Sequence, residues 1–355
     1  MDKKLRIAQV APLWYPVPPN KYGGTERVIS FLTEGLINRG HEVTLFAAPG
    51  SQTSAKLVSI FDQPLVEMGV EWSDHAWNMK NLQTVYERAQ AGEFDIIHNH
   101  IETFHLFMEN LVSTPTLTTI HNPLHYKKIE LGKQSRAVCY NASRDTTNIV
   151  FISNAMKEKA DINFKNSFVA YNSVDSKHFA FSDSPEDYFV WIARINKYKG
   201  IENAIAAAEK SRERLKIAGP IHHSQQEYFD TVVKPHLSDK IEYVGELTQE
   251  ELPAFYGKAK GLLYPIEWDE PFGLVVAEAM SCGTPVVAYR RGSMPELIKD
   301  GLNGYVVDSN IDDLVTAMGK LDKLDRKVVR ETIESIAGSE KMIDTYESIY
   351  RKLLS

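Results

Sequence analysis

Short apolar segments alternate with longer amphipathic ones along most of the chain, and this alternation constrains the fold more than any other feature. Apolar runs at 6–11, 42–47 and 116–120 have the length of buried strands. Between the first two, segment 25–40 carries apolar residues at helical spacing and ends at Gly40. Strands separated by helices indicate βαβ units, and therefore parallel sheets covered by helices on both faces.

The same pattern starts again after about residue 180, which indicates two α/β units in tandem. Because ligands bind at the carboxyl edges of parallel strands, we expect two Rossmann-like, doubly wound domains that face a cleft, 1–172 and 173–338. A last amphipathic helix is expected within 339–355. The other strands are expected at 94–98, 148–152, 168–171, 188–193, 215–218, 241–244, 261–264 and 285–289, and the other helices at 201–210 and 272–281.

Charge and composition exclude several classes of function. The chain of 355 residues has a net charge of −7, and its first 170 residues are neutral, with 17 basic and 17 acidic residues. General nucleic-acid binding normally requires a basic excess, so we expect no nucleic-acid partner. No run approaches the roughly 18 apolar residues of a transmembrane helix. Two cysteines without disulfide or metal-ligand spacing fit a reducing compartment, so a cytoplasmic location is expected.

The strongest chemical signal is a pair of carboxylates, Glu270 and Glu278, in the sequence DEPFGLVVAEAM. Glu278 lies inside an apolar helix, where an unpaired carboxylate is costly, so it should have a partner. The backbone N–H groups of Phe272, Gly273 and Leu274 open that helix and can hold an anion. A helix N-terminal acid followed by a structural ion pair is an equally good interpretation.

A second signal follows the strand expected at 188–193. Arg194 and Lys199 place two cations at the edge of the strand, an arrangement that suits a diphosphate. Solvated loop cations are the alternative. Strands followed by glycine recur at Gly219 and near Val244, where the backbone could approach a ligand or simply turn.

In the first half, paired glycines and histidines stand at the expected strand and helix ends. Gly23 and Gly24 precede the first helix and permit a close ligand approach, although a plain helix-initiating loop fits as well. His98 and His100 end one strand, and His121 follows another. A structural role is common for such histidines, and His121 is the better functional candidate because of its place at a carboxyl edge.

Together these motifs resemble the retaining glycosyltransferases of family 4, which have the GT-B fold, and in particular small bacterial members. The resemblance extends in the same order over nearly the whole chain. Two positions depart from the family pattern, Ala193 in place of a glycine and Ser173 in the family's Asn-Gly-Val-Asp. The segments that carry the resemblance are 16–26, 40–43, 94–98, 119–121, 194–199 and 270–278.

The resemblance implies a role for each matching residue, with the last helix crossing back to the first domain. It implies that Glu278 holds the ribose, that Glu270 contacts the donor sugar, and that Arg194 and Lys199 neutralise the diphosphate. His121 would lie beside the reacting face of the sugar, as a catalytic residue together with Glu270, Arg194 and Lys199. The remaining donor-binding positions would be Gly23, Gly24, Gly219, Val244, Phe272, Gly273 and Leu274.

The expected reaction is retaining transfer of a hexose, by default glucose from UDP-glucose, to an acceptor hydroxyl. No cofactor is expected, and no metal ion, since the sequence has no Asp-x-Asp motif. The acceptor, whether a sugar, a lipid or a small molecule, is not identified. The basic segment 121–144 leaves a peripheral membrane contact open. Candidate acceptor residues are Trp72, His75, Trp77 and Tyr126, although aromatic residues that pack within their own loop are an equal alternative.

Other functions are compatible with this fold. A nucleotide-sugar epimerase would act on the donor without an acceptor, and a sugar phosphorylase would require a pyridoxal-phosphate lysine, for which there is no signature. A non-catalytic sugar-nucleotide-binding protein is the third alternative. The presence of both cations, both carboxylates and His121 argues against loss of activity, and product analysis distinguishes the three.

Overall fold

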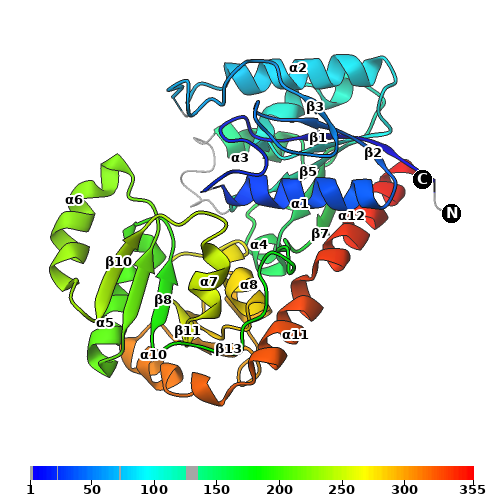
Figure 1. The fold of residues 1–355 in the computed structure, drawn as a ribbon. Helices are drawn as coiled ribbons and strands as arrows, with labels where there is room; N and C mark the ends of the chain where they lie inside the picture. The colour runs from blue at the N-terminus through cyan, green and yellow to red at the C-terminus, as the bar shows by residue number, and fades with distance from the viewer. Residues whose placement is uncertain (1–2, 22, 72, 125–134) are drawn as a thin grey trace. The chain divides into compact units, whose positions relative to one another are not determined.

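The computed structural model describes residues 3–21, 23–71, 73–124 and 135–355. The chain divides into two compact units, Met1–Asn172 with Glu340–Ser355, and Ser173–Ser339. Both are α/β units with a parallel sheet at the centre (Figure 1). In the described ranges no helix combines the length and the apolar content needed to cross a membrane.

The first unit has a sheet with the strand order β3-β2-β1-β4-β5-β6-β7 among the described residues, all pairs being parallel. The order reverses at the neighbours β1 and β4, whose following loops therefore leave on opposite faces. The strands are β1 (Arg6–Val10), β2 (Glu42–Phe46), β3 (Lys56–Val58), β4 (Ile96–Asn99), β5 (Thr116–Ile120), β6 (Asn148–Phe151) and β7 (Asn166–Val169).

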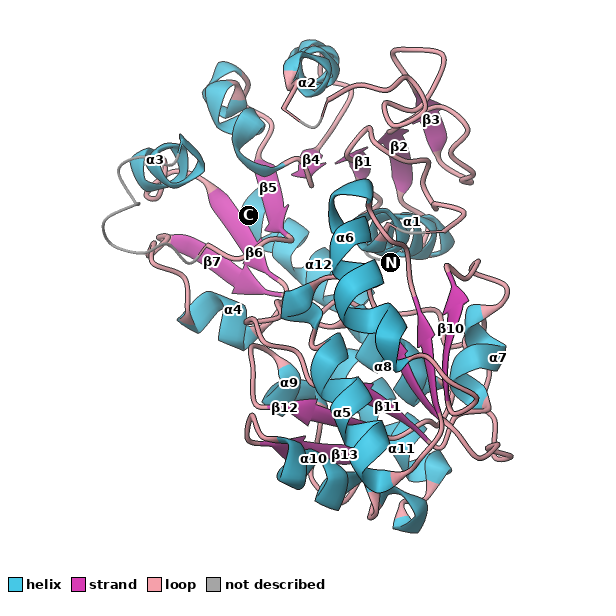
Figure 2. Ribbon diagram, turned by 90° about the vertical axis from the view of Figure 1, so that its left-hand side faces the viewer, coloured by secondary structure: helices cyan, strands magenta, loops and turns pink. Residues whose placement is uncertain are grey.

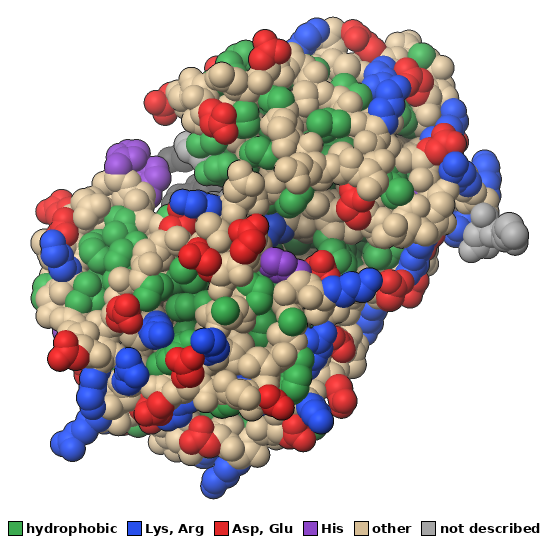
Figure 3. Space-filling view, viewed as in Figure 1, with side chains coloured by type: hydrophobic (Ala, Val, Ile, Leu, Met, Phe, Trp, Pro, Cys, Tyr) green, Lys and Arg blue, Asp and Glu red, His purple; other side chains and the backbone are tan. Residues whose placement is uncertain are grey.

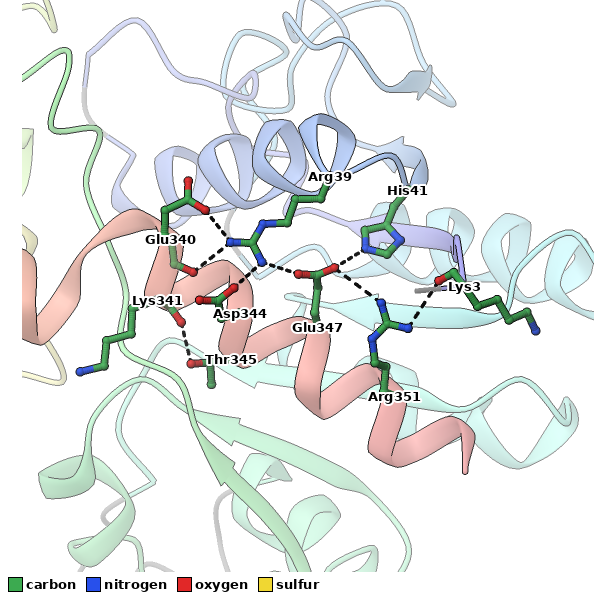
Figure 4. A network of polar contacts seen from close by, with 9 residues as sticks. All are labelled: Lys3, Arg39, His41, Glu340, Lys341, Asp344, Thr345, Glu347 and Arg351. Atoms are coloured by element: carbon green, nitrogen blue, oxygen red, sulfur yellow. Dashed lines mark hydrogen bonds and ion pairs between the residues drawn. The ribbon is translucent and has the colours of Figure 1, made fainter. Parts of the chain in front are cut away.

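Helices cover both faces of this sheet. Leu82 and Val85 of α2 (Ala76–Gln90) pack on Ala8 and Val10, while α1 (Gly24–Asn38) packs on the opposite face. The last helix, α12 (Ser339–Leu354), lies beside α1 (Figures 1 and 4). The short helical segments of this unit are η1 (Glu102–Phe107), η2 (Glu109–Leu111), α3 (Ser135–Ala142) and α4 (Asn154–Glu158).

Charged groups fix α12 to the first unit although it is the last element of the chain. Arg39, at the end of α1, donates to three carboxylates on successive turns of α12: Glu340, Asp344 and Glu347 (Figure 4). His41 contacts the same Glu347 at 2.7 Å. The guanidinium supplies several donors in a fixed geometry, which lets one residue hold more than two turns of helix.

The second unit has the strand order β10-β9-β8-β11-β12-β13 among the described residues, again with parallel pairs. Here the order reverses between β8 and β11. The strands are β8 (Phe189–Ile192), β9 (Leu215–Ala218), β10 (Ile241–Gly245), β11 (Gly261–Tyr264), β12 (Val286–Tyr289) and β13 (Gly304–Val307).

The core of this unit lies between the sheet and α5 (Ile201–Ser211) with α10 (Ile311–Met318), and includes Trp191 and Leu263. On the other face α8 (Leu274–Ser281) packs against α11 (Arg326–Ala337) and α7 (Leu252–Gly257) (Figure 2). Acidic and basic side chains of the described residues are interspersed over the face drawn in Figure 3.

The expected fold class is confirmed, and most expected strands lie within two residues of their predicted bounds. The helix expected at 272–281 begins later, at Leu274. The short edge strands β3 and β13 and the helices α2, α10 and α11 were not predicted.

The contact between α1 and α12 yields a stability prediction. A Cβ atom on Gly35 would lie 2.2 Å from Cδ1 of Ile343 on α12, so Gly35→Ala overpacks this contact. We expect Gly35→Ala to lower the free energy of unfolding by about 1–3 kcal/mol. Ile343→Val removes Cδ1, the nearest atom, but leaves Cγ1 at 2.8 Å, so it should restore part of the loss in the double variant. Urea denaturation of the four proteins tests this, and additive losses would contradict it.

Candidate active site

Two loops meet at the strand-order reversal of the second unit. One follows β8 and contains Arg194 and the short helix η3 (Lys197–Lys199), and the other follows β11 and contains Glu270. Since β8 and β11 are hydrogen-bonded neighbours, both loops leave the same edge of the sheet. In open α/β sheets this is the place where ligands bind.

A glycine lets the two loops come into contact. Gly200, directly after η3, has a φ of 75°, and a Cβ atom there would lie 1.8 Å from the carbonyl oxygen of Pro265. Any other residue would push the loops apart. One hydrogen bond joins the two loops, from Glu267 N to the Tyr198 carbonyl at 3.0 Å. A second, from Trp191 Nε1 on β8 to the Lys199 carbonyl at 3.2 Å, holds the first loop to its own strand.

Three donors converge on one oxygen of Glu270. Its Oε2 accepts from Lys199 Nζ at 2.9 Å, from Tyr264 OH at 2.9 Å and from Trp268 Nε1 at 3.0 Å. The Lys199 ammonium also lies 4.6 Å from the centre of the Trp268 ring, within the range of a cation–π contact. Within the described parts of the chain, every hydrogen bond of this carboxylate ends on Oε2. The second oxygen, Oε1, accepts no hydrogen bond from a described residue.

The second carboxylate, Glu278, has different surroundings. It lies on α8, it is only 2% exposed, and its Oε2 accepts from the hydroxyl of the fully buried Tyr256 at 2.8 Å. The buried carboxylate thus has the partner that its burial requires. The turn before α8 is fixed by Ser293, whose N–H donates to the Glu270 carbonyl at 3.0 Å and whose hydroxyl donates to the Phe272 carbonyl at 2.6 Å.

The other predicted donor residues of this unit lie at neighbouring strand and helix ends. Gly219 N donates to the Gly245 carbonyl at 2.8 Å, and a Cβ atom on Gly219 would lie 1.8 Å from the Ala193 carbonyl oxygen. Val244 lies where the pairing of β10 with β9 shifts register, which is typical of a β-bulge. Gly273 and Leu274 form the first turn of α8, with Gly273 as its N-cap.

In the first unit, two glycines and a buried glutamate stand at the start of α1. Gly23 is the N-cap of this helix and Gly24 its first residue. A Cβ atom on Gly23 would lie 2.7 Å from Pro19 Cγ, so this close packing requires glycine. Glu26 in the first turn is only 6% exposed, and burial raises its pKa to about 7.

Three histidines of the first unit, His98, His100 and His121, form a chain that begins at Tyr350 of α12. His98 contacts Tyr350 OH at 2.7 Å through Nδ1 and Thr119 Oγ1 at 2.8 Å through Nε2. Its ring lies 4.2 Å from that of His100, and His100 Nδ1 lies 3.0 Å from His121 Nε2. His121 is partly exposed and comes directly after β5, while the other two are buried.

The candidate acceptor residues that the structure describes pack against nearby aromatic rings. Trp77 makes an edge contact with Phe61, with ring centres 5.5 Å apart, and His75 lies 4.8 Å from the Phe104 ring. Both contacts agree with the alternative that these aromatic residues pack locally. Trp72 and Tyr126 lie outside the described residues, as does the part 125–134 of the basic segment 121–144.

One cation of that basic segment has a structural role. Arg136 Nε donates to Glu102 Oε2 at 2.7 Å, and its other nitrogens donate to the carbonyls of Pro123 and Asn122. The guanidinium therefore links η1 to the first residues after β5.

Two protein-family models match the chain, one on each half. The model of family 4 glycosyltransferases matches residues 22–178, and that of group 1 glycosyl transferases matches residues 175–335. The chain is a family 4-type glycosyltransferase. Four of the predicted site residues lie within the second match: Arg194, Lys199, Glu270 and Glu278.

Curated relatives of this glycosyltransferase are distant in sequence. An uncharacterized glycosyltransferase of Methanocaldococcus jannaschii is 28% identical over 229 residues, which cover 62% of this chain and 63% of the relative. The N-acetyl-alpha-D-glucosaminyl L-malate synthase of Bacillus anthracis is 24% identical, with 94% of both chains covered. Among solved structures, Anabaena HepE in complex with UDP and glucose has a TM-score of 0.75 at 18% identity, covering 98% of this chain and 99% of that one.

Two donors at the loop contact were missed by the sequence analysis, Tyr264 and Trp268. Both stand close to Glu270 in the sequence, one at the end of a strand and one two residues before the carboxylate. An aromatic hydrogen-bond donor beside a candidate carboxylate is the signal that could have identified them.

The buried histidines of this glycosyltransferase predict that acid destabilises its first unit. Burial lowers the pKa of His98 to about 3 and those of His105 and His121 to about 4, and it lowers the pKa of His100 as well. The folded rings stay neutral while those of the unfolded chain take up protons below pH about 6.5. Their contribution is therefore complete above that pH and is lost as the pH falls toward 4.

Two buried carboxyls act in the opposite direction. Burial raises the pKa of Glu26 and Glu109 to about 7, so their contribution to stability grows as the pH falls from 7 to 4.5. Between pH 6.5 and 4.5 the four histidines take up more protons on unfolding than the two carboxyls release. The free energy of unfolding should therefore fall by about 1.4 kcal/mol per pH unit for each net proton taken up on unfolding. Urea denaturation at half-unit steps measures this slope, and His105→Gln should reduce it by one proton. A flat profile would contradict the assignment of neutral histidines.

Proposed function

We propose that this glycosyltransferase transfers a hexose from a nucleoside-diphosphate sugar to an acceptor hydroxyl, with retention and without a metal ion. UDP-glucose is the donor we would test first, because the similarly folded HepE has been crystallised with UDP and glucose. The observation that supports the proposal best is the loop contact at the reversal of strand order, where Lys199 and Glu270 are paired and one carboxylate oxygen is left over.

The diphosphate is the first part of the donor that this contact suits. The Lys199 ammonium has three N–H donors and gives one to Glu270, which leaves two for phosphate oxygens. Arg194, on the same loop, is exposed and offers a planar set of donors. The first N–H groups of α8 have no acceptor within their helix and carry partial positive charge, which adds a third source of stabilisation.

The sugar is the second part of the donor that this contact suits. Since Tyr264, Trp268 and Lys199 hold one oxygen of Glu270, the carboxylate is fixed in orientation before a ligand arrives. The other oxygen can accept from a sugar hydroxyl. Such a preformed acceptor contributes to binding without the entropic cost of ordering a side chain. For the ribose, the family resemblance assigns Glu278, a buried carboxylate that a ligand hydroxyl would stabilise further.

Retention requires the acceptor to attack the face from which the diphosphate leaves. In the front-side route that we favour, the bond from the anomeric carbon to the diphosphate oxygen breaks and a bond to the acceptor oxygen forms. The acceptor proton passes to the departing phosphate oxygen. Positive groups near that oxygen stabilise the charge that develops there. A double displacement would use a nucleophilic carboxylate, and the three hydrogen bonds to Glu270 make it a poor nucleophile.

The alternatives of an epimerase and of a non-catalytic binder are not favoured. Both matching family models are glycosyltransferase models, and together they span residues 22–335. Analysis of products with donor alone and with donor plus acceptor separates the three cases.

Nucleotide binding provides the first test. We expect one of UDP, GDP, ADP or NAD, at about 100 times its Kd, to add about 2.7 kcal/mol to the stability of the folded protein and to raise Tm by several degrees. Glu278→Ala should abolish the rise, whereas Glu227→Ala, an exposed carboxylate on the second unit, should not. No shift with any nucleotide in a folded sample would contradict the donor site.

Turnover provides the second test. Once a donor and an acceptor are known, Lys199→Ala and Arg194→Ala should each lower kcat by about 10²–10³-fold, because the departing diphosphate loses a positive group. Lys210→Ala is the matched control, since this lysine is exposed and pairs with Asp312. Turnover near that of the wild type in both site variants would rule out the proposed role of the two cations.

A further inference from the structure

Three polar side chains of the first unit form a hydrogen-bonded line across neighbouring strand ends. Gln9 lies on β1 and is fully buried, His100 follows β4 and is 3% exposed, and His121 follows β5. Gln9 Oε1 lies 3.0 Å from His100 Nε2, and His100 Nδ1 lies 3.0 Å from His121 Nε2. The strands β1, β4 and β5 are adjacent in the sheet, so the three side chains come from neighbouring strand ends.

The chemistry of these groups determines where each proton lies. An amide oxygen only accepts, so His100 Nε2 must carry the proton that it shares with Gln9. Burial lowers the pKa of His100, and a neutral imidazole has one N–H, so its Nδ1 must accept. The donor in the second hydrogen bond is therefore His121 Nε2. Burial also lowers the pKa of His121 to about 4, so its ring is neutral near pH 7 and Nδ1 carries a lone pair.

The ring of His121 has a free side. In the part of the chain that the structure describes, its hydrogen bonds go to His100 alone, through Nε2. The side chain is partly exposed at the carboxyl edge of β5, where ligands bind in sheets of this kind.

We propose that His100 and Gln9 are positioning residues that hold the His121 imidazole neutral with its proton on Nε2, so that Nδ1 accepts a hydrogen bond from a hydroxyl of the bound substrate. This inference rests on the proposed function for the identity of the ligand. It deepens that function, because an acceptor at this point selects a substrate with a hydroxyl there over one whose corresponding atom cannot donate.

The C-terminal helix, through His98, restrains the hydrogen-bonded histidines. Tyr350 on α12 and Thr119 on β5 hold His98 by both ring nitrogens, and the His98 ring packs 4.2 Å from that of His100. His100 is thus restrained by packing as well as by its two hydrogen bonds. A ligand-binding group is held to its working geometry in this way when its supporting groups are themselves ordered.

The first experiment needs no substrate. In protein labelled with ¹⁵N-histidine, the ring nitrogens of His121, identified by comparison with His121→Gln, should show a protonated Nε2 and an unprotonated Nδ1 at pH 7. If the Gln9 amide had the reverse orientation, its N–H would donate to His100 Nε2. His100 Nδ1 would then donate to His121 Nε2, and the proton of His121 would lie on Nδ1. That result, or an even mixture of the two forms, would overturn the proposal whatever reaction the protein catalyses.

The second experiment measures the effect on transfer. His100→Leu removes the acceptor for His121 Nε2 and should lower kcat/KM by about tenfold, the value of one lost hydrogen bond. His100→Asn offers an amide oxygen near the position of Nδ1 and should restore most of the activity. In a His121→Ala background, His100→Leu should have no further effect.

The outcomes separate this inference from the proposed function. An equal loss from His100→Leu with and without His121 would show a general structural role and overturn the inference. The nucleotide-induced rise in Tm depends on the second unit, so it should persist in His100→Leu. Absence of transfer with every donor and acceptor would instead refute the proposed function, and the NMR result would stand by itself.

Discussion

The reversal of strand order between β8 and β11 is the constraint on which the candidate donor site depends. Adjacent parallel strands whose connections run to opposite faces leave their carboxyl ends uncovered by either crossover. The loop with Lys199 and the loop with Glu270 leave from this edge, and Gly200 removes the Cβ atom that would separate them. The pairing of a lysine and a glutamate 71 residues apart follows from this topology and this one glycine.

The first unit has the same kind of strand-order reversal, with different side chains beside it. Its order reverses between β1 and β4, and the side chains at and after these strands are Gln9 and His100, which are neutral and hydrogen-bonded in series. The second unit thus offers fixed charges suited to a diphosphate, whereas the first offers neutral acceptors and donors suited to hydroxyl groups.

The sequence was sufficient for the fold class and for the central strands, because fully buried parallel strands are continuous apolar runs. It was insufficient for β13, an edge strand in which only alternate residues are buried, and for α2, whose segment is rich in polar residues. Lys199 and Glu270 were each predicted as site residues, but their ion pair was not, and Tyr264 and Trp268 were missed. Pairing across loops depends on strand order, which the alternation of elements alone does not determine. The roles of the site residues stay predictions.

Pairing of Lys199 with Glu270 also balances charge within the second unit. Without this pair the ammonium would lack its counter-ion, and the carboxylate, whose side chain is only 13% exposed, would be desolvated without a compensating charge. Joined through Oε2, the two groups neutralise each other while the ammonium keeps two N–H donors and the carboxylate keeps one oxygen. The contact therefore stabilises the unliganded loops without consuming the groups that a ligand needs. Diphosphate binding next to Lys199 would add hydrogen bonds to an ordered arrangement, which is the condition under which electrostatic stabilisation of a leaving group is most effective.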